Sequence, residues 1–173
     1  MAFTSRHDAT LPKLVVCSRI AATQHLCGEP GAAPIQSLVS IGDPGTDLPV
    51  GHERARQILR LEFYDTGWSD TPFAPSARHV QSVVDFAPLA AELGGTCIVH
   101  CEAGVSRSPA TAIVLLAALL ASGQEDRAVQ AVLQCAPHAL PNGLVVRRGD
   151  EILRCDGALC RAVTSAFGRS PLV

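Results

Sequence analysis

Residues 98–109 read IVHCEAGVSRSP, and this stretch decides how the chain folds and what it can bind. It begins as an apolar strand and ends with Pro109, which suits the first turn of a helix because its missing N–H costs nothing there. Gly104 allows successive backbone N–H groups to converge on one point, and the N-terminus of the helix adds its partial positive charge. The stretch therefore predicts an anion-binding loop between a strand and a helix, with Cys101 at its base.

A phosphate group fits such a loop. The same positive field favours the thiolate form of Cys101, which is the form that attacks phosphorus. The planar guanidinium of Arg107 can hold two phosphate oxygens at once, a geometry that lysine cannot reproduce. We therefore expect Cys101 and Arg107 to be catalytic. The residues expected to bind phosphate are Glu102, Ala103, Gly104, Val105, Ser106 and Arg107.

These residues resemble the signature of the cysteine-based protein tyrosine phosphatase superfamily. The signature reads His-Cys, two residues, Gly, two residues, Arg, then Ser or Thr, and every fixed position matches here. Cys101 lies in the middle of the chain, whereas the low-molecular-weight branch carries its cysteine at the extreme N-terminus. The chain is most similar to small bacterial phosphatases of the dual-specificity type.

The resemblance implies a phosphatase that hydrolyses phosphotyrosine, with phosphoserine and phosphothreonine as further substrates, through a cysteinyl-phosphate intermediate. It implies no cofactor and no metal ion. The five variable loop positions, residues 102–106, carry one negative and no positive side chain, which favours phosphotyrosine over phosphoinositides. Two other classes stay open, a sulfurtransferase of the rhodanese type and a catalytically silent module that binds phosphoproteins.

A phosphate ester also needs an acid to protonate its leaving group, and two aspartates precede the signature at spacings similar to those of the small dual-specificity phosphatases. We choose Asp65 over Asp70 because Asp65 follows directly on an apolar strand, and parallel sheets place ligand sites at the carboxyl ends of their strands. An aspartate near glycine is also a common turn residue, which is the simpler explanation of Asp70.

Three further residues are candidates for supporting roles. His100 is expected to orient the loop through hydrogen bonds and to add to its positive field, or else to be a satisfied core histidine. Ser108 caps the helix after the loop or, as in families of this type, donates a hydrogen bond to the cysteine sulfur. Asn142, in a segment that resembles one from the same small phosphatases, ties the loop to its neighbours or caps a helix.

The rest of the chain reads as strands alternating with helices. This pattern predicts one α/β domain over residues 13–168, with a central and mostly parallel sheet flanked by helices. The apolar run at residues 110–121 predicts a central helix covered on every side. The expected strands are 14–17, 36–41, 57–63 and 96–100, and the expected helices are 18–26, 76–93, 108–121, 124–136, 142–153 and 159–167.

Composition limits the partners of the protein. The 173 residues have a net charge of −2, which provides no large basic face for nucleic acid or an anionic membrane, so a phosphorylated protein or a small phosphomonoester is the expected partner. Seven scattered cysteines without metal-ligand spacing and the lack of an N-terminal signal peptide indicate a cytoplasmic protein. Cys17 is the candidate partner for an oxidised Cys101. Segments 1–12 and 169–173 are expected to be a flexible N-terminal segment and a tail.

Overall fold

The computed structural model describes residues 11–28 and 34–168. Within these residues a single four-stranded sheet has the order β1-β4-β2-β3, and every strand pair is parallel. The strands are β1 (Lys13–Ser18), β2 (Ile35–Gly42), β3 (Ala55–Glu62) and β4 (Thr96–Cys101). The predicted α/β class is confirmed. The expected terminal segments 1–12 and 169–173 lie outside the described residues, apart from Leu11 and Pro12.

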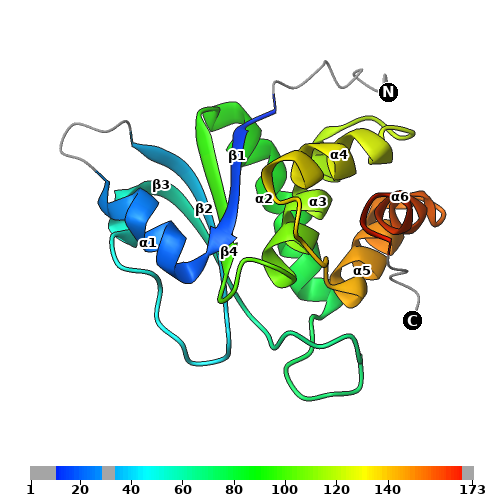
Figure 1. The fold of residues 1–173 in the computed structure, drawn as a ribbon, viewed down its shortest axis with the longest axis horizontal. Coiled ribbons are helices and arrows are strands. Elements are labelled where there is room, and N and C mark those ends of the chain that lie inside the picture. The colour runs from blue at the N-terminus through cyan, green and yellow to red at the C-terminus, as the bar shows by residue number, and fades with distance from the viewer. Residues whose placement is uncertain (1–10, 29–33, 169–173) are drawn as a thin grey trace, which may run out of the picture.

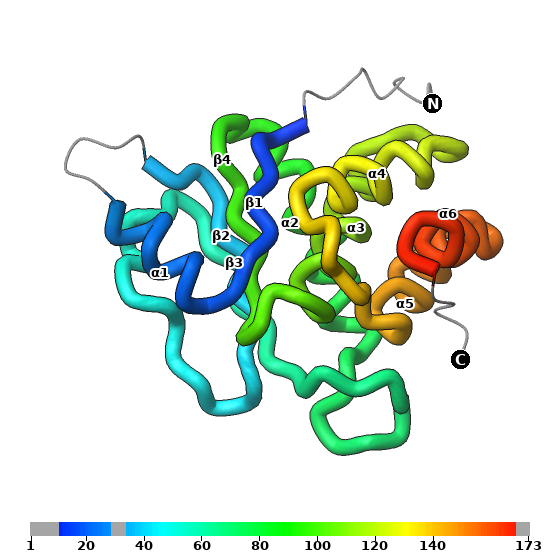
Figure 2. Tube along the Cα trace, viewed as in Figure 1, coloured from blue at the N-terminus to red at the C-terminus, as the bar shows by residue number. Residues whose placement is uncertain are grey.

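The two faces of the sheet are covered unequally (Figure 1). Helix α1 (Arg19–Cys27) lies on one face, where Ala22 and Leu26 are buried in one cluster with Leu38 and Ile98 of the strands. Figure 2 shows the other helices on the opposite side of the strands. These are α2 (Ala77–Leu93), α3 (Arg107–Leu119), α4 (Glu125–Cys135), α5 (Gly143–Leu153) and α6 (Ala158–Phe167). A short 3-10 helix, His52–Arg54, leads into β3.

Helix α3 is the centre of the larger core. Residues 107–116 are all buried, and α2, α4 and α5 pack against this helix. The prediction of a central helix covered on every side is confirmed for residues 110–116, whereas residues 117–119 are half-buried and the helix ends at Leu119, before the exposed Ala121. Because close-packed interiors do not deform continuously, this burial also fixes where α3 begins and so the backbone position of Arg107.

The carboxyl ends of the parallel strands lie at the same end of the sheet. Cys101 closes β4 there, in register with Ser18 at the end of β1. Asp43 follows directly after β2, and Asp65 comes shortly after β3. Ligand sites of parallel α/β sheets lie at this end. The topology thus gathers side chains that are far apart in the sequence.

Each expected helix and strand is present, and its ends move by no more than two residues; the third strand begins at Ala55 rather than at Gln57. Capping explains several of the helix starts: the Ser76 hydroxyl accepts a hydrogen bond from the His79 amide at the start of α2, and Asp150 accepts from the Gly157 and Cys160 amides at the start of α6. No helix in the described part of the chain is both long and apolar enough to cross a membrane.

Candidate active site

The sulfur of Cys101 lies at the base of the loop between β4 and α3. Cys101 is buried, with 2% of its surface exposed. The Gly104 amide donates to its Sγ at 3.2 Å, and the Ser108 hydroxyl lies 3.2 Å from the same atom. The Gly104 amide is a fixed donor to the sulfur, whereas either atom can be the donor in the Ser108 contact. Ser108 lies inside α3 and Ser106 is the N-cap, so the sulfur contact holds and the capping role does not.

Gly104 has a φ of 76°, which a residue with a side chain rarely adopts. A Cβ atom there would lie 2.5 Å from the carbonyl carbon of Cys17 and 2.5 Å from the amide nitrogen of Ser18. The Arg19 amide, at the start of α1, donates to the Glu102 carbonyl at 3.2 Å. The loop is therefore packed directly against the backbone where β1 becomes α1.

Arg107 is the first residue of α3, and only 5% of its surface is exposed. Its Nη1 donates to the Phe63 carbonyl at 2.8 Å and to Asp43 Oδ1 at 2.7 Å. Neither contact uses Nε or Nη2, and the buried Nε has no hydrogen-bond partner among the described residues. Buried donors are rarely left unsatisfied. One edge of the guanidinium is therefore available for an anion.

Asp65 is held beside the loop by two neutral donors. Its Oδ1 accepts from the Ser106 hydroxyl at 2.7 Å and from Asn142 Nδ2 at 2.8 Å. Asn142 Oδ1 accepts from the Val145 amide at 3.1 Å, which caps α5. The Asn142 side chain therefore caps α5 and holds Asp65, while its expected tie to the cysteine loop is made by its backbone amide, which donates to the Ser106 carbonyl at 3.1 Å. Asp70 is exposed in the surface loop that follows β3, and the structure does not bring it to the cysteine loop in the same way.

His100 is fully buried behind the loop. Its Nε2 lies 2.9 Å from the Ser40 hydroxyl and its Nδ1 lies 3.4 Å from the Cys101 carbonyl. Burial lowers the pKa of His100 to about 4. The ring is therefore neutral near pH 7, and the prediction that it adds to the positive field is wrong. It braces the end of β4 against β2 instead.

The predicted pairing of Cys17 with an oxidised Cys101 does not fit the strand register. Cys17 is paired with His100, so Cys17 and Cys101 are offset by one residue on neighbouring strands. Successive side chains of a strand point to opposite faces. Cys17 packs with the α1 cluster and Cys101 belongs to the core on the other face. Burial, with a smaller contribution from Cys101, raises the pKa of the Cys17 thiol to about 11.

Asp43 is the functional candidate that the sequence analysis missed. Residues 42–45 read GDPG, which is a typical turn sequence, and nothing local distinguishes Asp43 from a turn aspartate. The signal lies in the strand order, because β2 is the direct neighbour of β4 and ends beside it. That order becomes visible only in the folded sheet.

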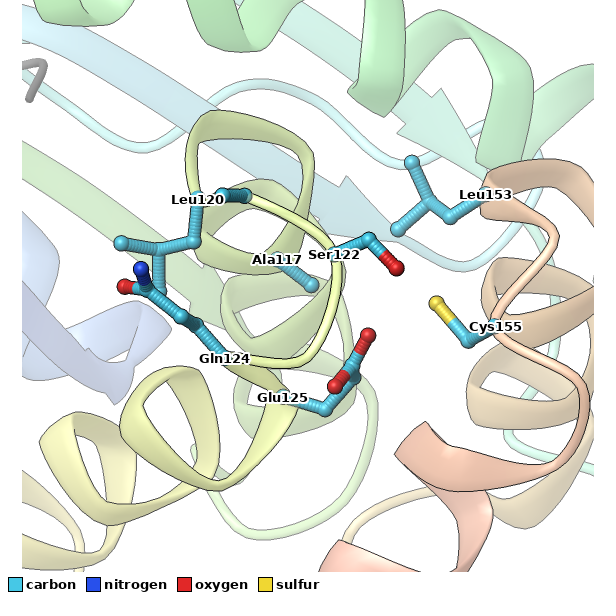
Figure 3. Close-up of a pocket in the computed structure, with 8 residues that line it drawn as sticks. Ala117, Leu120, Ser122, Gln124, Glu125, Leu153 and Cys155 are labelled. Carbon is cyan, nitrogen blue, oxygen red and sulfur yellow. The ribbon is translucent and has the colours of Figure 1, made fainter. Parts of the chain in front are cut away.

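A small cavity of about 80 Å³ lies away from this site, by the C-terminal end of α3 (Figure 3). Ser122, Glu125 and Cys155 turn their polar atoms toward it. Burial first, and then the nearby carboxylates of Glu125 and Asp150, raise the pKa of Cys155 to about 12. This thiol is therefore protonated and is not a second nucleophile.

Comparison with curated proteins shows similarity to dual specificity phosphatases. The chain is 32% identical over 92 residues to rat dual specificity protein phosphatase 15, a match that covers 53% of this chain and 39% of that protein. It is 33% identical over 88 residues to mouse dual specificity protein phosphatase 22, covering 49% and 48%. The chain thus spans less than half the length of these relatives. Both relatives are mammalian, so they do not support the bacterial part of the expectation. No family model matches the chain.

Solved structures share the fold. Human DUSP28 matches with a TM-score of 0.60 at 23% identity, covering 85% of this chain and 92% of that one. DUSP15 matches with a TM-score of 0.63 at 21% identity, covering 92% and 93%. A mouse putative dual specificity phosphatase, complexed with zinc tungstate, matches with a TM-score of 0.53 at 26% identity, covering 82% of each chain.

Proposed function

We propose that this chain, which has the fold and the signature sequence of the cysteine-based protein tyrosine phosphatase superfamily, is a protein phosphatase acting through a cysteinyl-phosphate. One observation carries the proposal. The Cys101 sulfur accepts a hydrogen bond from the Gly104 amide at the base of a loop whose arginine keeps one edge free, while Asp65 is tethered across the same loop. These three side chains lie at one end of the sheet, which supports the roles of nucleophile, anion holder and acid that we propose for them.

In the first step the Cys101 thiolate attacks phosphorus in line and the bond to the leaving oxygen breaks. The backbone amides of residues 102–107 and the free edge of Arg107 stabilise the charge on the equatorial oxygens. The Ser108 hydroxyl, 3.2 Å from the sulfur, stabilises the thiolate before attack and again when it departs from the phosphoenzyme.

Asp65 supplies the proton that the leaving oxygen needs. Its hydrogen bonds from Ser106 and Asn142 both use Oδ1, so Oδ2 is left to carry and deliver a proton. In the second step the same carboxylate takes a proton from water, which hydrolyses the cysteinyl-phosphate and releases inorganic phosphate. Every step uses residues of this chain and water.

The substrate that fits best is a phosphorylated protein, with phosphotyrosine preferred to a phosphoinositide. Loop positions 102–106 hold no positive side chain, and Glu102, Asp43 and Asp65 place negative charge around the entrance. Loop positions 102–106 therefore offer the additional phosphates of an inositol headgroup no basic side chain. All seven cysteines are free, so a reducing compartment such as the cytoplasm suits a mechanism that depends on a thiolate.

The test is phosphate release from phosphotyrosine peptides, phosphoserine peptides and phosphoinositides, combined with trapping of the phosphoenzyme by acid quench. We expect wild-type protein to release phosphate fastest from phosphotyrosine and to carry phosphate on Cys101. Cys101→Ser should lose turnover and keep binding of tungstate, because backbone amides and Arg107 form most of the anion site. Full activity of Cys101→Ser, thiosulfate turnover, or anion binding without any phosphoenzyme would each contradict the proposal.

A further inference from the structure

Large apolar side chains are gathered around Asp65 on the surface of the protein. Among the described residues eight large hydrophobic side chains are exposed. Five of them belong to three segments that hydrogen bonds join around this aspartate, and they are Tyr64, Trp68, Phe73, Val105 and Leu140. Single exposed apolar residues need no explanation, but a group of them at one place points to an interaction surface. We call these five residues the apolar rim.

Two of the three segments meet at the cysteine loop. The Leu140 amide donates to the Val105 carbonyl at 2.8 Å. The residues that follow them are tied to the proposed acid, because Ser106 Oγ and Asn142 Nδ2 donate to Asp65 Oδ1 at 2.7 Å and 2.8 Å. Val105 and Leu140 are therefore neighbours, one and two residues away from groups that are bonded to Asp65.

The third segment is the loop between β3 and α2, which projects at the bottom of the view in Figure 1. The Tyr64 amide donates to the Phe73 carbonyl at 2.9 Å, and the two rings meet edge to face with their centroids 5.8 Å apart. The Trp68 amide donates to Thr66 Oγ1 at 3.1 Å, and the Thr71 hydroxyl donates to the Trp68 carbonyl at 2.8 Å. The backbone of Trp68 is thus held on both sides, while the residue is 74% exposed.

We propose that the apolar rim binds the polypeptide of the substrate, and that the preferred phosphorylated residue has a large apolar side chain two or three positions away. The inference rests on the proposed function and adds a substrate class to it. A phosphate held above Cys101 brings the neighbouring residues of its own chain over the rim. Trp68 follows Asp65 by three residues, so their Cα atoms lie within roughly 11 Å. An extended peptide covers about 7–10 Å in two or three residues, which matches this reach.

A protein substrate fits this surface better than a membrane or a second copy of the chain. Asp70 and Glu102 are exposed in the same two loops as Trp68 and Val105, and their carboxylates would be repelled by an anionic lipid surface. A second copy would cover Asp65 for as long as it stayed bound. A substrate binds and leaves with each turnover, and exposed aromatic side chains supply much of the binding energy at such surfaces.

Trp68 is the only tryptophan of the chain, so its fluorescence reports the proposed contact directly. Cys101→Ser would be mixed with two phosphotyrosine peptides that differ only in carrying leucine or serine two and three positions from the phosphotyrosine, and calorimetry would establish that both are bound. We expect the leucine peptide to shift the emission to shorter wavelength, because the indole leaves water. The serine peptide and tungstate should leave the emission unchanged. No shift with the bound leucine peptide, or an equal shift with tungstate alone, would overturn the inference.

Steady-state kinetics on the same peptides tests the rim in the protein with its cysteine in place. We expect Trp68→Ala to lower kcat/KM for the leucine peptide about tenfold, mainly through KM, and to remove the preference over the serine peptide. Trp68→Phe keeps an aromatic ring and should retain most of the preference. Val50→Ala is the matched control and should behave as wild type, because Val50 is 71% exposed but its carbonyl lies 3.7 Å from the Cys27 sulfur, at the far end of α1.

The outcomes separate the inference from the proposed function. Equal kcat/KM of wild-type protein for the two peptides, or a preference that survives in Trp68→Ala, would overturn the inference. Self-association or binding to anionic vesicles that Trp68→Ala abolishes would also overturn it, by assigning the rim to a second copy or to a membrane. An aryl phosphate has no flanking residues, so failure of wild-type protein to hydrolyse it would instead overturn the proposed function.

Discussion

Asp43 and Asp65 follow neighbouring strands of one sheet, yet their surroundings differ. Asp43 pairs with the guanidinium of Arg107, a charged partner. Asp65 accepts from Ser106 and Asn142, which are neutral, and both contacts use the same carboxylate oxygen. Each aspartate uses only Oδ1 in these contacts, so the difference between them is the charge of the partner, which is a cation at Asp43 and two neutral donors at Asp65. In the mechanism we propose, the partner of each aspartate, rather than its residue type or its place in the sheet, separates a residue that orients from one that reacts.

Replacing the reactive carboxylate should give the largest effect. We expect Asp65→Asn to slow turnover of substrates with poor leaving groups by roughly 10²–10⁴, because the leaving oxygen then departs without a proton. An aryl phosphate with a very acidic leaving group should lose much less. Turnover across a series of aryl phosphates checks this. Asp70→Asn is the control; if it shows this leaving-group dependence and Asp65→Asn does not, the acid is Asp70.

Replacing Arg107, the ion-pair partner of Asp43, tests whether the Asp43 side of the site acts separately from Asp65. We expect Arg107→Lys to lower kcat/KM by roughly 10²–10³, because lysine offers a point charge instead of a planar fork. The contacts of Asp65 do not involve Arg107, so the dependence on the leaving group should match that of wild type. Steady-state kinetics on the same aryl phosphates measures both quantities. A change in leaving-group dependence would show that the two carboxylates do not act separately.

Strand β2 ends directly before Asp43, and its Ser40 is in contact with the buried, neutral ring of His100. Burial lowers the pKa of His100 to about 4, so the unfolded chain binds more protons than the folded one between that value and 6.5. Stability should therefore fall as the pH drops through this window, by roughly 1–2 kcal/mol between pH 7.5 and 5. Urea unfolding at both pH values measures this. His100→Gln can still bond to Ser40 and should remove that part of the pH dependence; an unchanged dependence would contradict the prediction.

Loosening Asp65 while leaving it in place should have the smallest effect. We expect Ser106→Ala to slow turnover of poor leaving groups about fivefold, the equivalent of one hydrogen bond of about 1 kcal/mol. The Ser106 side chain caps no helix amide, so the fold should not weaken. Asn142→Ser can retain the cap of α5 and loses the donation to Asp65, so it should act in the same direction. Thermal unfolding separates these effects from a loss of stability.

The sequence predicted the fold and the cysteine loop well because both depend on local patterns. The alternation of strands with helices and the spacing from Cys101 to Arg107 are properties of neighbouring residues. The sequence also placed Asp65 shortly after a strand, and its role as the acid stays a prediction. In each of these cases the signal and the structure it predicts lie in the same short segment.

The remaining contacts depend on strand order and on burial. Asp43 meets Arg107 only because β2 lies beside β4, an arrangement that no local segment specifies. The neutral state of His100 follows from its complete burial. The separation of Cys17 from Cys101 follows from a register offset of one residue. These three features depend on which strands and helices pack together. A short segment of sequence does not contain that information.

The packing of Gly104 against the Cys17 carbonyl and the Ser18 amide makes β1 and the start of α1 part of the support of the proposed active-site loop. Strand β1 borders the sheet and pairs only with β4 within the described residues. Outer strands fray more readily than central ones. Shortening the chain into β1, or fusing a bulky partner close to Lys13, should therefore reduce turnover before it reduces helix content. The loss of turnover on N-terminal trimming therefore measures how much β1 stabilises the cysteine loop.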